Sequence, residues 1–170
     1  MITASARRSW TVWLGLSIAA WMQLRRGLEG QPSELATHFG ISGAADSWMS
    51  HSSFMALQIA LWLCVTLCFW GSRYLLSLVP AELISLPERD YWLDPSRRAE
   101  TMAKIAAWME SLGLVTLLFL MGINQSLFEA NRLPEPRLGT SFFVALCLYF
   151  GCTVAWAVAL FRVFRRPLGD

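Results

Sequence analysis

The run SFFVALCLYFGCTVAWAVALF, residues 141–161, contains no charged residue. A helix of this length covers about 30 Å, which is the thickness of the hydrocarbon core of a bilayer. Three more apolar runs precede it, at about 10–24, 54–70 and 105–123. The chain is 55% hydrophobic and 15% charged, whereas an average soluble domain is about 25% charged. We therefore expect an all-α, polytopic integral membrane protein in which residues 1–170 form one membrane domain, a four-transmembrane-helix bundle.

The Lys and Arg residues predict how this bundle is oriented. Ten of the 14 lie in the amino-terminal arm, in segment 71–104 and after residue 161, and four lie in the other two connections. Because cytoplasmic loops retain positive charge, we expect a multi-pass protein of the cytoplasmic (inner) membrane with both termini and segment 71–104 in the cytoplasm. The first run could also be a signal peptide, but the bulky Trp21 and Met22 favour a retained anchor.

The outer loop, 25–53, is too polar to enter lipid and is rich in turn formers. Pro32 suits the first turn of a helix and Gly40 suits its left-handed end. We therefore expect a short lid helix from about Pro32 to Phe39. A zinc site made by His38, His51 and a carboxylate is conceivable, but the spacing fits no compact ligand motif. Likewise, Cys64 and Cys68 are interpreted as packing residues rather than metal ligands. We expect no metal and no cofactor.

The outer loop also carries a resemblance. Its residues His38, Phe39, Gly40, Gly43, Asp46, Trp48 and Ser50 precede an apolar run. This pattern resembles the uncharacterised membrane-domain family that also forms the amino-terminal part of the sporulation-delaying-toxin immunity proteins, in which a loop reading roughly His-Phe, Gly, Asp, Trp, Ser, Lys joins the first two helices. His51 stands here at the basic position. Residues 86–98 are similar to a cytoplasmic segment of short family members. The resemblance implies a binding loop that includes His38, Phe39, Gly40, Gly43, Asp46 and Trp48.

The cytoplasmic segment 71–104 combines apolar and basic residues. Pro80 interrupts it, and we expect an interfacial piece that lies on the inner leaflet. Asp94 and Pro95 predict the start of a helix that continues into the third span. Two basic residues in the first turn of that helix need compensation, either from anionic headgroups or from a docking partner. The candidate contact residues are Arg89, Tyr91, Trp92, Arg97 and Arg98.

One carboxylate, Glu110, lies inside the third apolar run. A lone charge in a span requires a partner or water. Arg73 and Arg162 lie at the same predicted end of the bundle, so we expect an intramembrane ion pair with one of them. Snorkelling to headgroups and a proton or ion site are the alternatives.

The sequence contains no nucleophile with a base, no phosphate-binding glycine loop and no dinucleotide fingerprint, and its net charge of +2 suggests no nucleic-acid partner. We therefore expect a non-enzymatic membrane protein. The resemblance to toxin-immunity and envelope-sensing proteins implies that its outer loop binds a membrane-active peptide or an envelope component. The alternative is a small accessory or assembly subunit, with a protein partner in the membrane.

Overall fold

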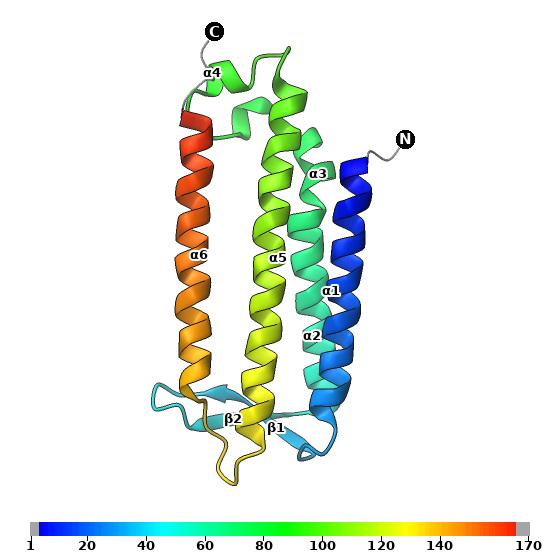
Figure 1. The fold of residues 1–170 in the computed structure, drawn as a ribbon, viewed down its shortest axis with the longest axis vertical. Helices are drawn as coiled ribbons and strands as arrows, with labels where there is room; N and C mark the ends of the chain where they lie inside the picture. The colour runs from blue at the N-terminus through cyan, green and yellow to red at the C-terminus, as the bar shows by residue number, and fades with distance from the viewer. Residues whose placement is uncertain (1–3, 166–170) are drawn as a thin grey trace. The chain divides into compact units, whose positions relative to one another are not determined.

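A computed structural model describes residues 4–165 of the chain, and the side chains of residues 9–165. Arg166, which contributes to the charge count above, lies outside this range. The fold is 73% helix with two short strands. Its elements, in chain order (Figure 1), are α1 (Ala4–Leu28), β1 (Glu34–Phe39), β2 (Ala45–Ser50), α2 (His51–Val65), the π-helix η1 (Thr66–Trp70), α3 (Ser72–Leu75), the 3₁₀ turns η2 (Leu76–Leu78) and η3 (Ala81–Leu83), α4 (Arg89–Trp92), α5 (Arg98–Asn131) and α6 (Thr140–Arg165).

Three helical segments are long and apolar enough to cross a membrane: His51–Trp70, Arg98–Asn131 and Thr140–Arg165, with 20, 34 and 26 residues. They correspond to the second, third and fourth apolar runs of the sequence, and each extends beyond the predicted bounds. They indicate a membrane protein.

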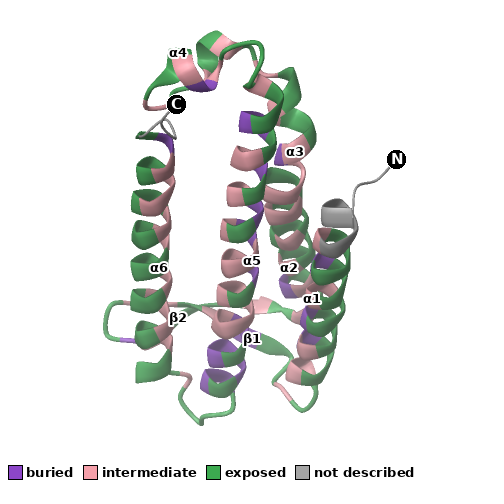
Figure 2. Ribbon diagram, turned by 45° about the horizontal axis from the view of Figure 1, so that its top comes forward, coloured by how far each residue is buried: buried purple, intermediate pink, exposed green. Residues whose placement is uncertain are grey.

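The exposure of α6 is the reverse of that in a soluble protein. Leu148, Phe150 and Val154 expose 64%, 59% and 62% of their surface, and most of the helix is exposed in Figure 2. The less exposed positions, 142, 146, 149, 153 and 156, recur every three or four residues and so form one face. This pattern is typical of a helix that packs on its protein neighbours along one stripe and faces lipid elsewhere.

The described chain forms two compact units. Unit 1 contains residues 4–61 and 117–147, and unit 2 contains residues 62–116 and 148–165. Helices α2, α5 and α6 each contribute one part to either unit.

Unit 1 has a core where α1, α2 and α5 meet the strands. Leu24, Leu35, Phe54, Leu127 and Phe128 are all buried there. The rings of Phe54 and Phe128 pack edge to face with centroids 5.9 Å apart, an arrangement that aromatic pairs prefer. Figure 1 shows the strands at the carboxyl ends of α1 and α5.

The outer loop forms an antiparallel hairpin. Strand β1 pairs with β2 from Glu34 opposite Ser50 to Phe39 opposite Ala45, with register shifts on either side of His38. Its turn is closed by the N–H of Gly43, which donates to the carbonyl of Gly40 at 2.8 Å. Gly43 has φ +77°, a conformation that L side chains rarely adopt.

The hairpin is held on α5 by the side chain of Asn131. Its Oδ1 accepts from the N–H of Ala36 at 2.7 Å, and its Nδ2 donates to the carbonyl of Ala36 at 2.9 Å. Nδ2 also donates to the carbonyl of Leu127. Ala36 is fully buried, so this amide satisfies backbone groups that water cannot reach.

The predicted lid helix from Pro32 to Phe39 is wrong, because Glu34–Phe39 is a strand. In a helix, the N–H and carbonyl of Ala36 would form hydrogen bonds within the segment itself. Here they bind the side chain of Asn131, and the extended backbone pairs with β2. Gly40 does not have a left-handed conformation. Among the described residues, the glycines with positive φ are Gly30, just after α1, and Gly43 in the hairpin turn.

Unit 2 packs segment 71–104 against the carboxyl end of α6. The indole N–H of Trp92 donates to the carbonyl of Phe164 at 2.8 Å, and the two rings pack edge to face. The hydroxyl of Thr101 donates to the carbonyl of Trp92. All three residues are buried.

Helix α5 begins at Arg98, three residues after the predicted start at Pro95. Residues 95–97 form a turn, in which the carbonyl of Asp94 accepts from the N–H groups of Arg97 and Arg98. The hydroxyl and N–H of Ser96 both donate to the carboxylate of Asp94, and these bonds lower the pKa of Asp94 below its ordinary value. Asp94 therefore caps this turn.

The anchor on Ala36 gives a stability prediction. Replacement Asn131→Leu leaves two buried backbone groups without a partner, and each costs about 1 to 3 kcal/mol. We expect the free energy of unfolding in detergent to fall by roughly 2 to 6 kcal/mol. The matched control is Glu135→Leu in the exposed loop after α5, which should change it by less than about 0.5 kcal/mol. Equal stabilities of the two variants would contradict the anchor.

Candidate functional site

The hairpin places two titratable side chains side by side on its exposed face. Nδ1 of His38 donates to Oδ1 of Asp46 at 2.5 Å, and the side chains expose 72% and 51% of their surface. The register shifts beside His38 bring these two residues of β1 and β2 together, although Ser47 is the backbone partner of His38.

A groove of about 410 Å³ lies beside this pair. One wall is the run Thr37–Ile41 of β1 and the turn, and the others are Ile123 and Leu127 of α5, Leu138, and Phe142 and Phe143 of α6. All of these residues belong to unit 1. The volume falls within the usual range for small-molecule or side-chain pockets, roughly 300 to 1,000 Å³, and the lining is largely apolar.

The remaining residues of the predicted binding loop have different surroundings. Phe39 and Gly40 line the groove. Gly43 is buried in the turn, where its carbonyl accepts from the N–H of Leu138. Trp48 of β2 is exposed by 51% and is not among the residues that line the groove.

The second histidine of the outer loop, His51, has a different partner from His38. Nε2 of His51 donates to the carbonyl of Pro32 at 2.6 Å and so ties the start of α2 to the start of the hairpin. Within the described residues, no group of three or more His, Cys, Asp and Glu lies close enough together to hold a metal ion.

The predicted cytoplasmic contact residues divide into packed and accessible members. Trp92 is buried, and a guanidinium nitrogen of Arg98 donates to the carbonyl of Val79 at 2.7 Å. Arg97 lies over the ring of Tyr91, at 4.1 Å from its centroid, within the range of a cation–π contact. Arg89 is exposed. The accessible members are therefore Arg89, Tyr91 and Arg97.

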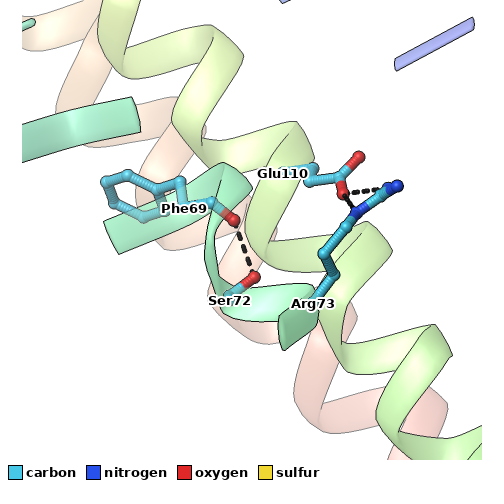
Figure 3. Close-up of polar contacts among 4 residues, drawn as sticks. All are labelled: Phe69, Ser72, Arg73 and Glu110. Carbon is cyan, nitrogen blue, oxygen red and sulfur yellow. Dashed lines mark hydrogen bonds and ion pairs between the residues drawn. The ribbon is translucent and has the colours of Figure 1, made fainter. Parts of the chain in front are cut away.

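The structure brings Arg73 and Glu110 together in unit 2 (Figure 3). Nε of Arg73 donates to Oε1 of Glu110 at 2.6 Å, and a terminal guanidinium nitrogen binds the same oxygen. The side chains expose only 21% and 10% of their surface. Arg162, the other predicted partner, lies exposed in the last turn of α6.

The π-helix η1 sets the direction of Arg73. At its end the N–H of Gly71 donates to the carbonyl of Thr66, five residues earlier, which places one extra residue in the turn. The hydroxyl of Ser72 then donates to the carbonyl of Phe69 at 2.6 Å (Figure 3). Each extra residue rotates the following side chains by about 100° around the axis, so η1 decides which face carries Arg73.

Sequence reasoning missed several polar contacts of unit 1. One is the Asn131 anchor. Another is a bond from Nδ2 of Asn124 on α5 to Oε1 of Gln58 on α2, at 3.0 Å. Polar side chains inside apolar runs often join helices in membranes, so the amides at 58, 124 and 131 were a usable signal.

Comparison with protein-family models, with curated proteins and with solved structures finds no match to this chain. The resemblance to the membrane-domain family therefore stays a prediction.

The Arg73–Glu110 pair predicts coupling between the two positions. Removing one charge leaves the other half-buried without its partner, so Glu110→Gln and Arg73→Gln should each destabilise the protein, and the double variant should be milder than their sum by roughly 0.5 to 3 kcal/mol.

The control cycle pairs Glu110→Gln with Arg162→Gln. There we expect the loss of stability in the double variant to equal the sum of the two single losses. Thermal unfolding in detergent measures both cycles. Additivity in the Arg73 cycle would show that the pair contributes no net interaction.

Proposed function

We propose that the protein is a non-enzymatic, four-span membrane protein whose hairpin binds an apolar segment of a membrane-active peptide on the outer face of the membrane. The single observation that carries the proposal is the apolar groove at the hairpin, with the exposed His38–Asp46 pair beside it.

Helix α1 serves as the fourth span in this proposal. It has 25 residues, which gives a length of about 37 Å, sufficient to cross the hydrocarbon core. Trp10, Ile18 and Trp21 expose 52%, 54% and 47% of their surface. Exposed large apolar side chains along a helix favour a lipid environment.

Segment 71–104 lies on the cytoplasmic surface in this proposal, as the charge asymmetry predicts. Its short helices expose Leu75, Leu78 and Leu83 by 56%, 79% and 75%. Such leucines, followed by accessible Arg89 and Arg97, suit a segment that dips apolar side chains into the bilayer while its basic groups contact anionic headgroups.

The occupant of the groove is inferred from its lining. Ile41 at the hairpin tip is fully exposed, and the other walls are aliphatic and aromatic, so the groove suits an apolar side chain or a short turn of an amphipathic peptide. The His38–Asp46 pair offers polar groups for the peptide backbone or its charged residues. A peptide that disrupts membranes carries both kinds of groups, and its capture by the hairpin would keep it from the bilayer.

The groove gives a direct test. Replacement Ile41→Asp puts a charge in its wall without disturbing the core, because this side chain is exposed. Leu133→Asp is the matched control, since Leu133 is 50% exposed and lies outside the groove. Cells with and without the protein are challenged with a panel of membrane-permeabilising peptides, and membrane depolarisation is recorded at equal protein abundance.

We expect protection against at least one peptide, at least about tenfold in effective concentration for a contact worth 1.4 kcal/mol or more. Ile41→Asp should abolish this protection, and Leu133→Asp should keep it. Absence of protection against the whole panel would contradict the proposal. Stoichiometric co-purification with another membrane protein in mild detergent would then favour an accessory subunit.

A further inference from the structure

A second groove in unit 1 lies between α1 and α5, away from the hairpin tip. Its volume is also about 410 Å³. On α1 it is lined by Ala19, Met22 and Arg26, and opposite them by Gln125 and Phe128 of α5 and by Arg132, the residue directly after α5. These positions are spaced by three or four residues, so each set lies along one face of its helix.

On both sides of the groove, the lining residues change from apolar or neutral to basic towards the hairpin. Helices α1 and α5 both end at the hairpin (Figure 1). Arg26 lies in the last turn of α1, and Arg132 directly follows the last residue of α5. The helices approach closely here, because a Cβ on Gly27 would lie 2.1 Å from the ring of Phe128. Nε2 of Gln23 donates to the carbonyl of Met121 at 2.9 Å, and this bond fixes the position of α1 along the axis of α5. The groove is therefore amphipathic along its length, with two guanidinium groups at its hairpin end.

Arg26 and Arg132 bring two positive charges to the hairpin end of the groove. Among residues 9–165, neither Arg26 nor Arg132 has an ion-pair partner. The nearby carboxylate of Glu129 accepts from Gln125 at 2.8 Å. Both guanidinium groups are exposed and face the same groove. Two like charges beside one cavity favour an anion between them, and arginine binds phosphate oxygens through paired N–H groups.

We propose that this groove binds an anionic phospholipid of the leaflet on the hairpin side. The phosphate lies between Arg26 and Arg132, and an acyl chain runs over Ala19, Met22 and Phe128 towards the middle of the membrane. An anion alone would leave the apolar part of the groove empty, and an apolar chain alone would leave the arginines unpaired. This site differs from the hairpin groove and from the basic residues of segment 71–104, and it requires only that unit 1 lies in the bilayer.

Hydrogen exchange of residues 125–132 provides a local measurement, because it does not report binding at segment 71–104. The full chain in detergent is titrated with phosphatidylglycerol, and in parallel with phosphatidylcholine and with inorganic phosphate. We expect saturable protection by phosphatidylglycerol and none by the other two. Protection by phosphatidylcholine to the same extent would mean a site for acyl chains without charge selection. Protection by inorganic phosphate to the same extent would mean a site for a free anion. Either result would overturn the proposal.

Variants assign the protection to the two arginines. Each arginine that contacts the lipid phosphate should strengthen binding about fivefold, so Arg26→Gln with Arg132→Gln should weaken it roughly 30-fold. The control is Arg25→Gln with Arg137→Gln, which removes the same charge from exposed residues outside the groove and should bind as the unchanged protein does. Arg26→Lys with Arg132→Lys keeps the charge. This variant should bind the lipid more tightly than the glutamine pair and more weakly than the unchanged protein. Equal weakening by the glutamine pair and its control would show that only net charge matters and would also overturn the proposal.

Discussion

The absence of water from the interior of a bilayer is the constraint on which the structure depends, because polar groups in the spans must find partners within the protein. Most large apolar side chains of α6 are exposed, and polar side chains of the spans face one another. Asn124 binds Gln58, Arg73 binds Glu110, and the hydroxyls of Thr116 and Tyr149 lie 3.0 Å apart. Each of these contacts joins segments distant in the sequence, so the polar residues define how apolar helices pack.

The same logic explains the hairpin. Where the chain leaves the apolar helices, its backbone needs new partners, and Asn131 at the end of α5 supplies both a donor and an acceptor to Ala36. The loop after α5 adds two more contacts, since the N–H of Ala45 donates to the carbonyl of Pro136 and the N–H of Leu138 donates to the carbonyl of Gly43. The hairpin is thus a fixed platform rather than a loose loop, and this is what allows it to form the wall of a groove.

Hydropathy predicted the three helical segments that are long and apolar enough to cross a membrane, including the long α5, because a run of about 20 apolar residues is typical of a membrane-spanning helix. The Arg73–Glu110 contact could be expected for a similar reason, since a charge in a span requires a partner. The strand at 34–39 could not be predicted from local preferences, because Pro32 and Gly40 also suit a helix, and the deciding bond comes from Asn131, more than 90 residues away. The π-helix before Gly71 likewise left no clear signal in the sequence.

The orientation of the hairpin tests the account most directly, because the proposed function requires the hairpin to lie outside. Single cysteines at Ser42, Ser85 and Glu135, three exposed positions, are introduced into a chain whose four native cysteines have been replaced. A membrane-impermeant thiol reagent is then added to intact cells. The account predicts labelling at 42 and 135, and labelling at 85 only after the membrane is opened. Labelling of intact cells at 85 but not at 42 and 135 would contradict it.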